Sequence, residues 1–334
     1  MTAVYVSNAD SGEISVLHLD ERGTLETLQE MVVGGQVMPL AVSPHRRFLY
    51  AARRSEPRAV IGYRIYAETG ELALIGQAPL PESMAFIATD RSGRFLFSAS
   101  YGGGLVAVSP VDADGRPQPA HQVLCTGPKA HAIQSDPANR HVFATSLESD
   151  RVLQYRFDAG SGRLLPNDPP ALAVRSRAGP RHFVFHPRLP RVYLLNELDA
   201  GVDVLAYDAR RGTLAPLQTV TALPAGFSGE PWAAELRLTP DGRFLYTSER
   251  RSSTIAGFAV DAASGCLAPI GQWATQTQPR GMAIDPPGHF LIVAGQLSHH
   301  VGVHRIDPDS GALALVGEHA VGANPSWVEA ITPG

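Results

Sequence analysis

The sequence predicts an all-β fold, a single seven-bladed β-propeller domain over residues 1–334. Three observations predict it: a turn motif that occurs seven times, a hairpin motif that keeps the same phase, and chain ends that carry complementary parts of one repeat. The turn is a Gly-x-Leu-like element whose copies lie 45 to 53 residues apart. These copies begin at Gly23, Gly70, Gly115, Gly162, Gly212, Gly265 and Gly311.

The hairpin motif supplies two strands of each repeat. SPHRRFLY, which begins at Ser43, and TPDGRFLY, which begins at Thr239, both pass from one apolar strand through a tight polar turn into the next. Pro fixes φ in such a turn, and Gly accepts positive φ. An alternating strand follows, as in RVLQYRFD from Arg151, and a last strand comes after the Gly-x-Leu turn. Each repeat therefore has four antiparallel strands, the unit of a propeller blade.

The two chain ends complete one blade between them. Residues 3 to 30 begin with a second and a third strand, whereas the C-terminal segment NPSWVEAITPG has only a first strand. We expect Ser326 to Thr332 to pair with the N-terminal blade, because ring closure removes open sheet edges. The alternative architecture, an open β-solenoid, does not need this exchange.

Composition limits the classes of function. Hydrophobic residues make up 44% of the chain and charged residues 18%, which favours a packed core over disorder. The net charge is −4 and no Lys/Arg run is present, so we expect no nucleic-acid partner. No apolar stretch reaches the roughly 18 residues of a membrane helix, and the first residues do not read as a signal peptide. We therefore expect a cytoplasmic protein without a membrane partner, a monomer or weak homodimer, with Cys125 and Cys266 as free thiols.

Equivalent positions of the seven repeats can be compared within this one sequence. The position that starts the innermost strand is apolar or small in most repeats, but it is His131, Arg181 and Arg280 in three. The full set is Met38, Ala85, His131, Arg181, Ala234, Arg280 and Trp327. Innermost strands line the channel, so their first residues should converge at one mouth. In a regular strand His182 points away from Arg181, and we expect it to pack in the core.

The second strand of each repeat returns to the same mouth, because it is antiparallel to the first. The residues at its end are Asn8, Arg53, Ser100, Ser146, Glu197, Glu249 and Gly295, followed in the last two repeats by Arg250 and Gln296. Asn196, Gln278 and Lys129 stand beside these positions and are further candidates for ligand contact. Cations, a carboxylate and a histidine thus collect on one rim. No third ligand is spaced to join His299 and His300, so we expect no metal.

At these same residues the chain resembles the bacterial 6-phosphogluconolactonases of the β-propeller type, a family that also includes fungal carboxymuconate-cyclising enzymes. The segments that carry the resemblance are GQVMPLAVSP from Gly35, GPRHFVFHP from Gly179, LNELDAGVDV from Leu195, WAAELRLTPDGRFLY from Trp232, TQTQPRGM from Thr275 and GQLSHHVGV from Gly295. The resemblance implies a seven-bladed propeller that opens or closes lactones without a metal or organic cofactor. It implies site roles for His131, Arg181, Glu197, Arg250 and Arg280.

We therefore expect an enzyme that hydrolyses an aldono-1,5-lactone to the acid. His131 or Glu197 would be the general base, and Arg181 the third catalytic group. The expected substrate-binding residues are Arg280, Arg250, Asn196, Gln278, Arg53, Gln296 and Lys129. Pro231 and Leu297 stand where the enterobacterial pattern has cations, so we expect unphosphorylated lactones to be accepted. Lactone isomerisation in the same site and a non-catalytic binding module are the alternatives.

Overall fold

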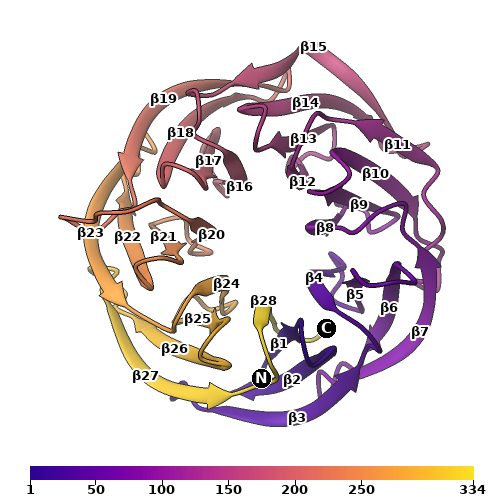
Figure 1. The fold of residues 1–334 in the computed structure, drawn as a ribbon, viewed down its shortest axis with the longest axis horizontal. Helices are drawn as coiled ribbons and strands as arrows, with labels where there is room; N and C mark the ends of the chain where they lie inside the picture. The colour runs from indigo at the N-terminus through magenta and orange to yellow at the C-terminus, as the bar shows by residue number, and fades with distance from the viewer.

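The computed structural model describes residues 1–334 as seven four-stranded antiparallel sheets around a central channel (Figure 1). The blade that closes the ring contains β28 (Pro325–Ile331), β1 (Thr2–Asn8), β2 (Glu13–Leu19) and β3 (Leu25–Val32). The next two blades contain β4 (Val37–Val42), β5 (Phe48–Arg53), β6 (Ala59–Ile65) and β7 (Leu72–Pro79), then β8 (Phe86–Thr89), β9 (Phe95–Ser100), β10 (Leu105–Pro110) and β11 (Gln122–Cys125).

The other four blades repeat this order. Their strands are β12 (Ala130–Ser135), β13 (His141–Ser146), β14 (Arg151–Asp158) and β15 (Arg163–Ala173); β16 (Pro180–Phe185), β17 (Arg191–Asn196), β18 (Gly201–Asp208) and β19 (Thr213–Thr221); β20 (Ala233–Leu238), β21 (Phe244–Glu249), β22 (Thr254–Val260) and β23 (Leu267–Ala274); and β24 (Pro279–Ile284), β25 (Phe290–Gly295), β26 (His300–Ile306) and β27 (Leu313–Ala320). In each blade the first strand lines the channel and the fourth lies at the rim (Figure 1).

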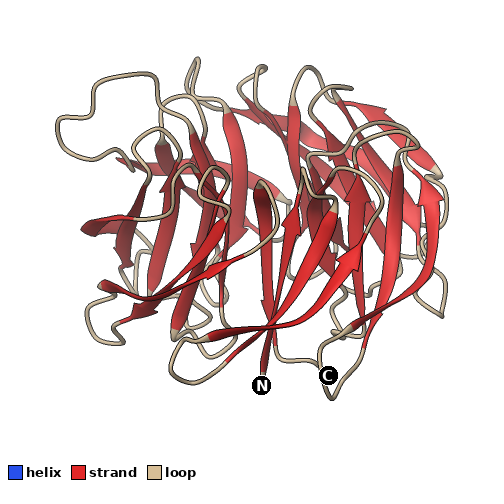
Figure 2. Cartoon of the chain, turned by 60° about the horizontal axis from the view of Figure 1, so that its bottom comes forward, coloured by secondary structure: helices blue, strands red, loops and turns tan.

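Ring closure occurs as the sequence predicts. β28 pairs antiparallel with β1, and Trp327 lies opposite Ser7 in the register. The two chain ends therefore lie close together, on one face of the ring (Figures 1 and 2). The open solenoid is excluded. The structure contains no helix that is long and apolar enough to span a membrane.

The Gly-x-Leu turns link neighbouring blades. In four blades a second-strand tyrosine donates its hydroxyl hydrogen to a glycine carbonyl in the turn of the next blade, as Tyr5 does to Gly70 at 2.7 Å. The other pairs are Tyr50 with Gly115, Tyr193 with Gly265 and Tyr246 with Gly311. Gly70 has φ of 78°. A Cβ atom there would lie 2.7 Å from the Cβ of Ala3, so the turn needs glycine for its conformation and for close blade contact.

Bulges interrupt the innermost strands at the mouth where these strands begin. The β16–β17 register shifts between Pro180 and His182, and β4, β12, β20 and β24 have shifts at their starts too. A bulge re-aims side chains, so strict alternation fails here. His182 is buried as predicted, but it does not point away from the channel. It contacts rings of three other innermost strands: Phe86, His131 and Trp327.

Candidate active site

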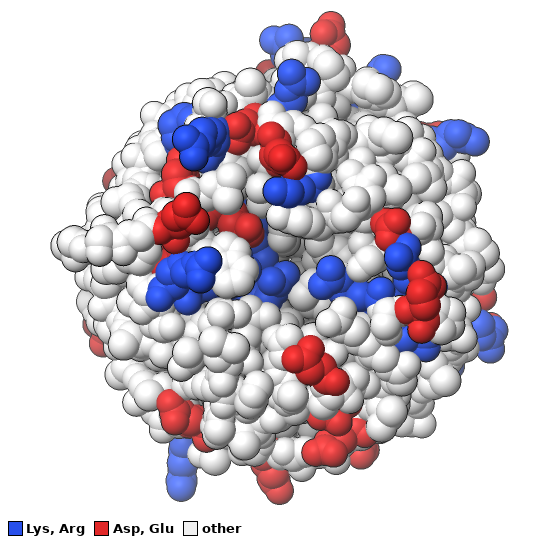
Figure 3. Space-filling model, in the orientation of Figure 1, with Lys and Arg blue, Asp and Glu red and all other residues white.

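A cavity of about 210 Å³ opens at the channel end where the innermost strands begin. It is large enough for a ligand of monosaccharide size. Figure 3 views this mouth, where blue side chains surround the central hollow. The lining residues are Met38, Arg54, Ala85, Tyr101, His131, Glu197, Trp232, Arg250 and Arg280.

Two equivalent positions of the repeat supply most of this lining. Met38, Ala85, His131 and Arg280 occupy the predicted position at the start of the innermost strand. Arg54, Tyr101, Glu197 and Arg250 occupy a second position, each directly after the last residue of the second strand of its blade. Successive side chains of a strand point to opposite sides, so one position faces the cavity and the preceding one does not.

That second position shifts the predicted register by one residue in two blades, where Arg54 and Tyr101 line the cavity in place of Arg53 and Ser100, whereas Arg250 was predicted. Arg53 was predicted to face the substrate, but its Nε donates to the Pro57 carbonyl at 2.8 Å, and Arg54 lines the cavity instead. Glu197 already occupies this second position, because its strand ends one residue earlier, at Asn196, which lies as far from Arg181 as Arg53 lies from Met38. The strand-end side chains fasten loops: Ser100, for example, donates to the Ser83 carbonyl at 2.8 Å.

Glu197 is clamped between two arginines. Its Oε2 accepts hydrogen bonds from Nε of Arg181 at 2.7 Å and from Nη2 of Arg250 at 2.9 Å. Burial alone would raise the pKa of this carboxyl, but Arg181, Arg250 and Arg280 outweigh burial and lower the pKa. Glu197 is therefore ionised at neutral pH. Arg181 is only 1% exposed and lies behind Glu197 rather than at the cavity surface.

Arg280 is the cation with spare donors. Its guanidinium lines the cavity but makes no hydrogen bond and no ion pair with the protein, whereas Arg181 and Arg250 both donate to Glu197 nearby. Burial and the repulsion of Arg181 lower the pKa of Arg280 to about 9, so it stays protonated at neutral pH. Arg54 adds a second cation, held by Ser83 at 3.0 Å. Unsatisfied guanidinium donors in a sheltered cavity bind an oxyanion, a carboxylate or a phosphate.

His131 is the only imidazole that lines the cavity, and it is 3% exposed. Its Nδ1 is buried and has no hydrogen-bond partner, which leaves Nε2 as the ring nitrogen available to the cavity. Burial, followed by the charges of Arg181, His182, Arg280 and Arg250, lowers the pKa of His131 well below its usual value. His131 is therefore neutral at neutral pH. Burial and the arginines together outweigh the Glu197 carboxylate, which acting alone would have favoured the protonated ring.

An aromatic wall completes the cavity. Trp232 comes from the long loop between β19 and β20, which projects from the ring in Figure 1. The guanidinium carbon of Arg250 lies 3.8 Å from the Trp232 ring centroid, and that of Arg251 lies 4.9 Å away. Tyr101 stands across the cavity, beside His131 at 6.0 Å between ring centroids. The repeat comparison did not find Trp232, because it selected charged and polar residues, although Trp232 directly precedes β20 as Lys129 precedes β12.

Four other predicted binding residues lie outside this cavity. Asn196 is fully buried and bonds to Gly201 and Asp203 within its own blade. Gln278 donates to Gln296 at 3.0 Å, and Gln296 in turn donates to Asn324. Lys129 has φ of 59° in a turn, and its Nζ lies 3.4 Å from Oε2 of Glu148.

Lys129 still lies close to the site. It lines a neighbouring shallow cavity together with Tyr101, and its ammonium group is 5.7 Å from the Tyr101 ring centroid. Lys129 could therefore contact the outer part of a ligand, whereas Asn196 is turned into the blade, away from the cavity.

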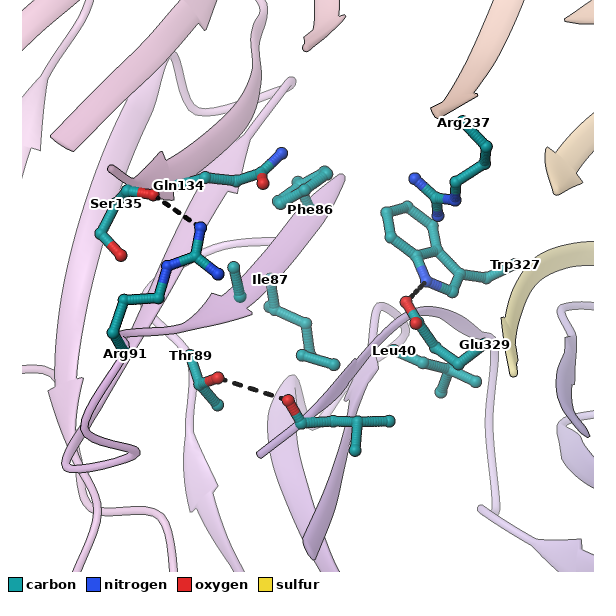
Figure 4. Close-up of a pocket in the computed structure, with 13 residues that line it drawn as sticks. Leu40, Phe86, Ile87, Thr89, Arg91, Gln134, Ser135, Arg237, Trp327 and Glu329 are labelled. Atoms are coloured by element: carbon teal, nitrogen blue, oxygen red, sulfur yellow. Dashed lines mark hydrogen bonds between the residues drawn. The ribbon is translucent and has the colours of Figure 1, made fainter. Parts of the chain in front are cut away.

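The opposite end of the channel holds a second cavity of about 290 Å³ (Figure 4). Its arginines are occupied: Arg91 donates to the carbonyl oxygens of Ser135 and Asp136, and Arg237 donates to Met282 and Glu235. Glu329 accepts a hydrogen bond from the Trp327 indole N–H at 2.8 Å. Burial raises the pKa of Glu329, the reverse of the shift at Glu197.

Fold and site together define a propeller enzyme whose arginine-rich mouth stabilises negative charge beside a neutral imidazole. The family model described as lactonase, seven-bladed β-propeller, matches residues 2–330. The 6-phosphogluconolactonases of Pectobacterium atrosepticum and Cronobacter sakazakii are 44% and 43% identical over 283 and 282 residues, 84% of this chain and 84% of each relative. The chain belongs to this lactonase family, as the sequence predicts.

The structural comparison agrees with this assignment. The periplasmic gluconolactonase of Pseudomonas aeruginosa superposes with a TM-score of 0.92 at 30% identity and covers 100% of both chains. A protein from Lactobacillus plantarum superposes with a TM-score of 0.90 at 26% identity and covers 99% of both chains.

Proposed function

We propose that the protein hydrolyses a sugar 1,5-lactone to the aldonic acid in the arginine-lined cavity. The observation that carries the proposal is the pairing of Arg280, whose guanidinium has no protein partner, with a neutral His131 in the same cavity. Lactone hydrolysis needs a base to activate water and a cation where the carbonyl oxygen becomes negative. The cavity offers both, and family membership assigns the same chemistry.

In the proposed reaction, Nε2 of His131 accepts a proton from a water molecule as that water attacks the lactone carbonyl carbon. The carbonyl oxygen becomes an oxyanion, which the Arg280 guanidinium stabilises. The intermediate then collapses and the bond from the carbonyl carbon to the ring oxygen breaks. The departing ring oxygen takes the proton from His131, which returns to its neutral form. The product carboxylic acid ionises and releases one proton to solvent.

Glu197 serves better as a clamp than as the base. Its Oε2 is already occupied by Arg181 and Arg250, and these cations stabilise its ionised form against taking up a proton. It holds Arg250 against the Trp232 wall, where that guanidinium shapes the cavity. This arrangement favours His131 over Glu197, the choice that the sequence left open.

For the substrate, we propose that the lactone is accepted with or without a 6-phosphate. The matching relatives are named 6-phosphogluconolactonase in two cases and gluconolactonase in another. Arg251 and Lys129 stand at the cavity edge next to Trp232 and Tyr101, where they could contact a phosphate at the far end of the sugar. Neither is built into the cavity floor, so neither would be essential for an unphosphorylated lactone.

A cytoplasmic location and a monomeric or weakly dimeric state are also proposed. Cell fractionation followed by immunoblotting tests the location, and light scattering after gel filtration tests the mass. A periplasmic pool would refute the first, and a stable higher oligomer the second.

The test of function is acid release from glucono-1,5-lactone at constant pH, measured against the spontaneous rate. We expect saturable hydrolysis with gluconate as the product by NMR. Appearance of the 1,4-lactone in place of gluconate would favour the isomerase. No acceleration with either the lactone or its 6-phosphate would refute lactone hydrolysis here.

A further inference from the structure

Behind His131 the channel is filled by a second histidine and a carboxylate that the proposed reaction does not use. His182 and Glu235 are 2% and 1% exposed. His182 Nδ1 lies 2.9 Å from Glu235 Oε1. The same oxygen accepts hydrogen bonds from the Leu236 backbone N–H at 3.0 Å and from Arg237 Nη1 at 3.1 Å.

These contacts determine which nitrogen of His182 carries hydrogen. Glu235 Oε1 receives two other donors, and both the backbone N–H and the guanidinium can only donate. The oxygen is therefore an acceptor whether or not the carboxyl group holds a proton on its other oxygen. His182 must donate to it through Nδ1–H. Burial and the charges of Arg181 and Arg237 lower the pKa of His182, so the ring is neutral and its Nε2 carries a lone pair.

Two ring nitrogens are left without hydrogen-bond partners in this buried part of the channel. His182 Nε2 and His131 Nδ1 are both buried and make no hydrogen bond. The two rings pack with centroids 4.9 Å apart at an interplanar angle of 67°. An unpaired buried polar atom costs free energy, and the His182 nitrogen can only be satisfied by a donor. The adjacent His131 Nδ1 becomes that donor if it carries the hydrogen of the neutral ring.

We propose that His182 and Glu235 are positioning residues that hold His131 in the Nδ1–H tautomer, with its Nε2 lone pair facing the lactone cavity. Nδ1–H of His131 donates to Nε2 of His182, directly after a small ring movement or through one buried water. The opposite tautomer would place two lone pairs face to face. The catalytic role of this arrangement rests on the proposed hydrolysis. The tautomer of His131 can be tested without it.

The chain of hydrogen bonds also explains how a histidine among arginines can accept a proton. When Nε2 of His131 takes the proton from water, the ring carries hydrogen on both nitrogens and one positive charge. Arg181, Arg250 and Arg280 oppose that charge. The bond to His182, which is held in turn by Glu235, spreads that charge over a second ring. Burial raises the pKa of Glu235, so its role here is to orient the histidine pair through the hydrogen bond that it accepts; a carboxyl group that orients a histidine is a known device of acid–base catalysis.

The experiment has two independent readouts. The first is the ¹⁵N NMR signature of the His131 ring in the ligand-free protein, which requires no activity. The second is the steady-state rate with glucono-1,5-lactone. In the wild-type protein we expect the Nδ1–H tautomer. In His182→Phe, which keeps an aromatic ring but offers no acceptor, we expect the Nε2–H tautomer to become populated and kcat to fall at least about 10-fold with KM within about 3-fold.

Two further variants separate positioning from packing. His182→Gln offers an amide oxygen as acceptor, so it should restore the Nδ1–H tautomer and most of kcat. Phe86→Leu is the matched control, because Phe86 packs on His182 at 5.2 Å without a hydrogen bond, and it should change neither readout. An Nε2–H tautomer in the wild type, or an unchanged tautomer in His182→Phe, would overturn the inference and leave lactone hydrolysis untouched. A protein with the Nδ1–H tautomer but no lactonase activity would refute the function alone.

Discussion

At the end of the channel where the innermost strands begin, Glu197 lies between Arg181 and Arg250, whereas at the other end Glu329 has only the Trp327 indole as donor. Arginines stand at both ends. At the first end Arg280 keeps its donors free, while at the second Arg91 gives its hydrogens to backbone carbonyl oxygens. Residue type alone therefore does not locate a site, because the partners already bound decide what remains for a ligand.

The two ends also differ in how carboxylates are charged. The arginines lower the pKa of Glu197 in spite of burial, and burial raises the pKa of Glu329 because no cation lies close enough to overcome it. An ionised clamp with free guanidinium donors beside it stabilises a developing negative charge. A carboxyl group that tends to stay protonated does not.

The largest expected effect comes from opening the ring itself. Deletion of residues 324–334 removes β28, which supplies the innermost strand of one blade and buries Trp327 in the channel. The exposed edge of β1 and the lost packing should unfold or aggregate the protein. Circular dichroism and thermal melting measure this. A truncated protein with unchanged melting temperature would mean that the channel does not depend on closure.

Next in size is the loss of the base at the active end. His131→Ala should reduce kcat by at least about 10²-fold, since a positioned general base contributes about 10²–10⁴-fold. The fold should be intact, because the substitution leaves the blade hydrogen bonds in place. Initial rates with glucono-1,5-lactone and a far-ultraviolet spectrum check both statements. A near-normal kcat in this variant would show that a residue other than His131 is the general base.

A smaller effect distinguishes the two carboxylates by stability. At pH 7 Glu197→Gln should lose about 3–5 kcal/mol of unfolding free energy, because two buried arginines lose their partner. Glu329→Gln should be neutral or stabilising at the same pH. Urea unfolding at pH 7 measures both.

The pH dependence should differ in sign as well. The Glu197 pKa is lowered, so its contribution to stability is present above the unfolded value of 4.5 and is lost as pH falls through the folded value. The Glu329 pKa is raised, so its contribution is present below 4.5 and is lost as pH rises through the folded value. The free energy of unfolding of Glu329→Gln should therefore increase relative to that of the wild type as pH rises from 4.5 to 8. The opposite trend would contradict the assignment.

The smallest expected effect concerns the phosphate. Because the cations that could reach it lie at the cavity edge, the preference of kcat/KM for the 6-phosphate over gluconolactone should be below about 10³-fold, equivalent to about 4 kcal/mol. Parallel assays of the two substrates measure it. A larger preference would contradict this prediction and would show that binding of the phosphate is essential for activity.

The sequence predicted the fold because seven repeats constrain one another, and it predicted the start of the innermost strand because Met38, Ala85, His131 and Arg280 share one phase. It missed Arg54 and Tyr101 because a strand alternates, and an error of one residue exchanges loop-fastening side chains such as Arg53 for cavity-facing ones. It predicted that His182 is buried, but not that its ring fills the channel, because the bulge beside Pro180 breaks that alternation. Trp232 directly precedes β20, as Lys129 precedes β12 and Gln278 precedes β24, but the comparison selected charged and polar residues and so passed over an aromatic one.

The most direct test of the account is a matched pair of arginine variants, one at each end of the channel. Arg280→Ala should reduce kcat/KM for glucono-1,5-lactone by about 10²–10³-fold, because the developing oxyanion loses its free guanidinium. Arg91→Ala should keep activity within about 3-fold of the wild type, because its hydrogens already serve the Ser135 and Asp136 carbonyl oxygens. Equal losses in the two variants, or a loss in Arg91→Ala alone, would contradict the placement of the active site at the mouth that Arg280 lines.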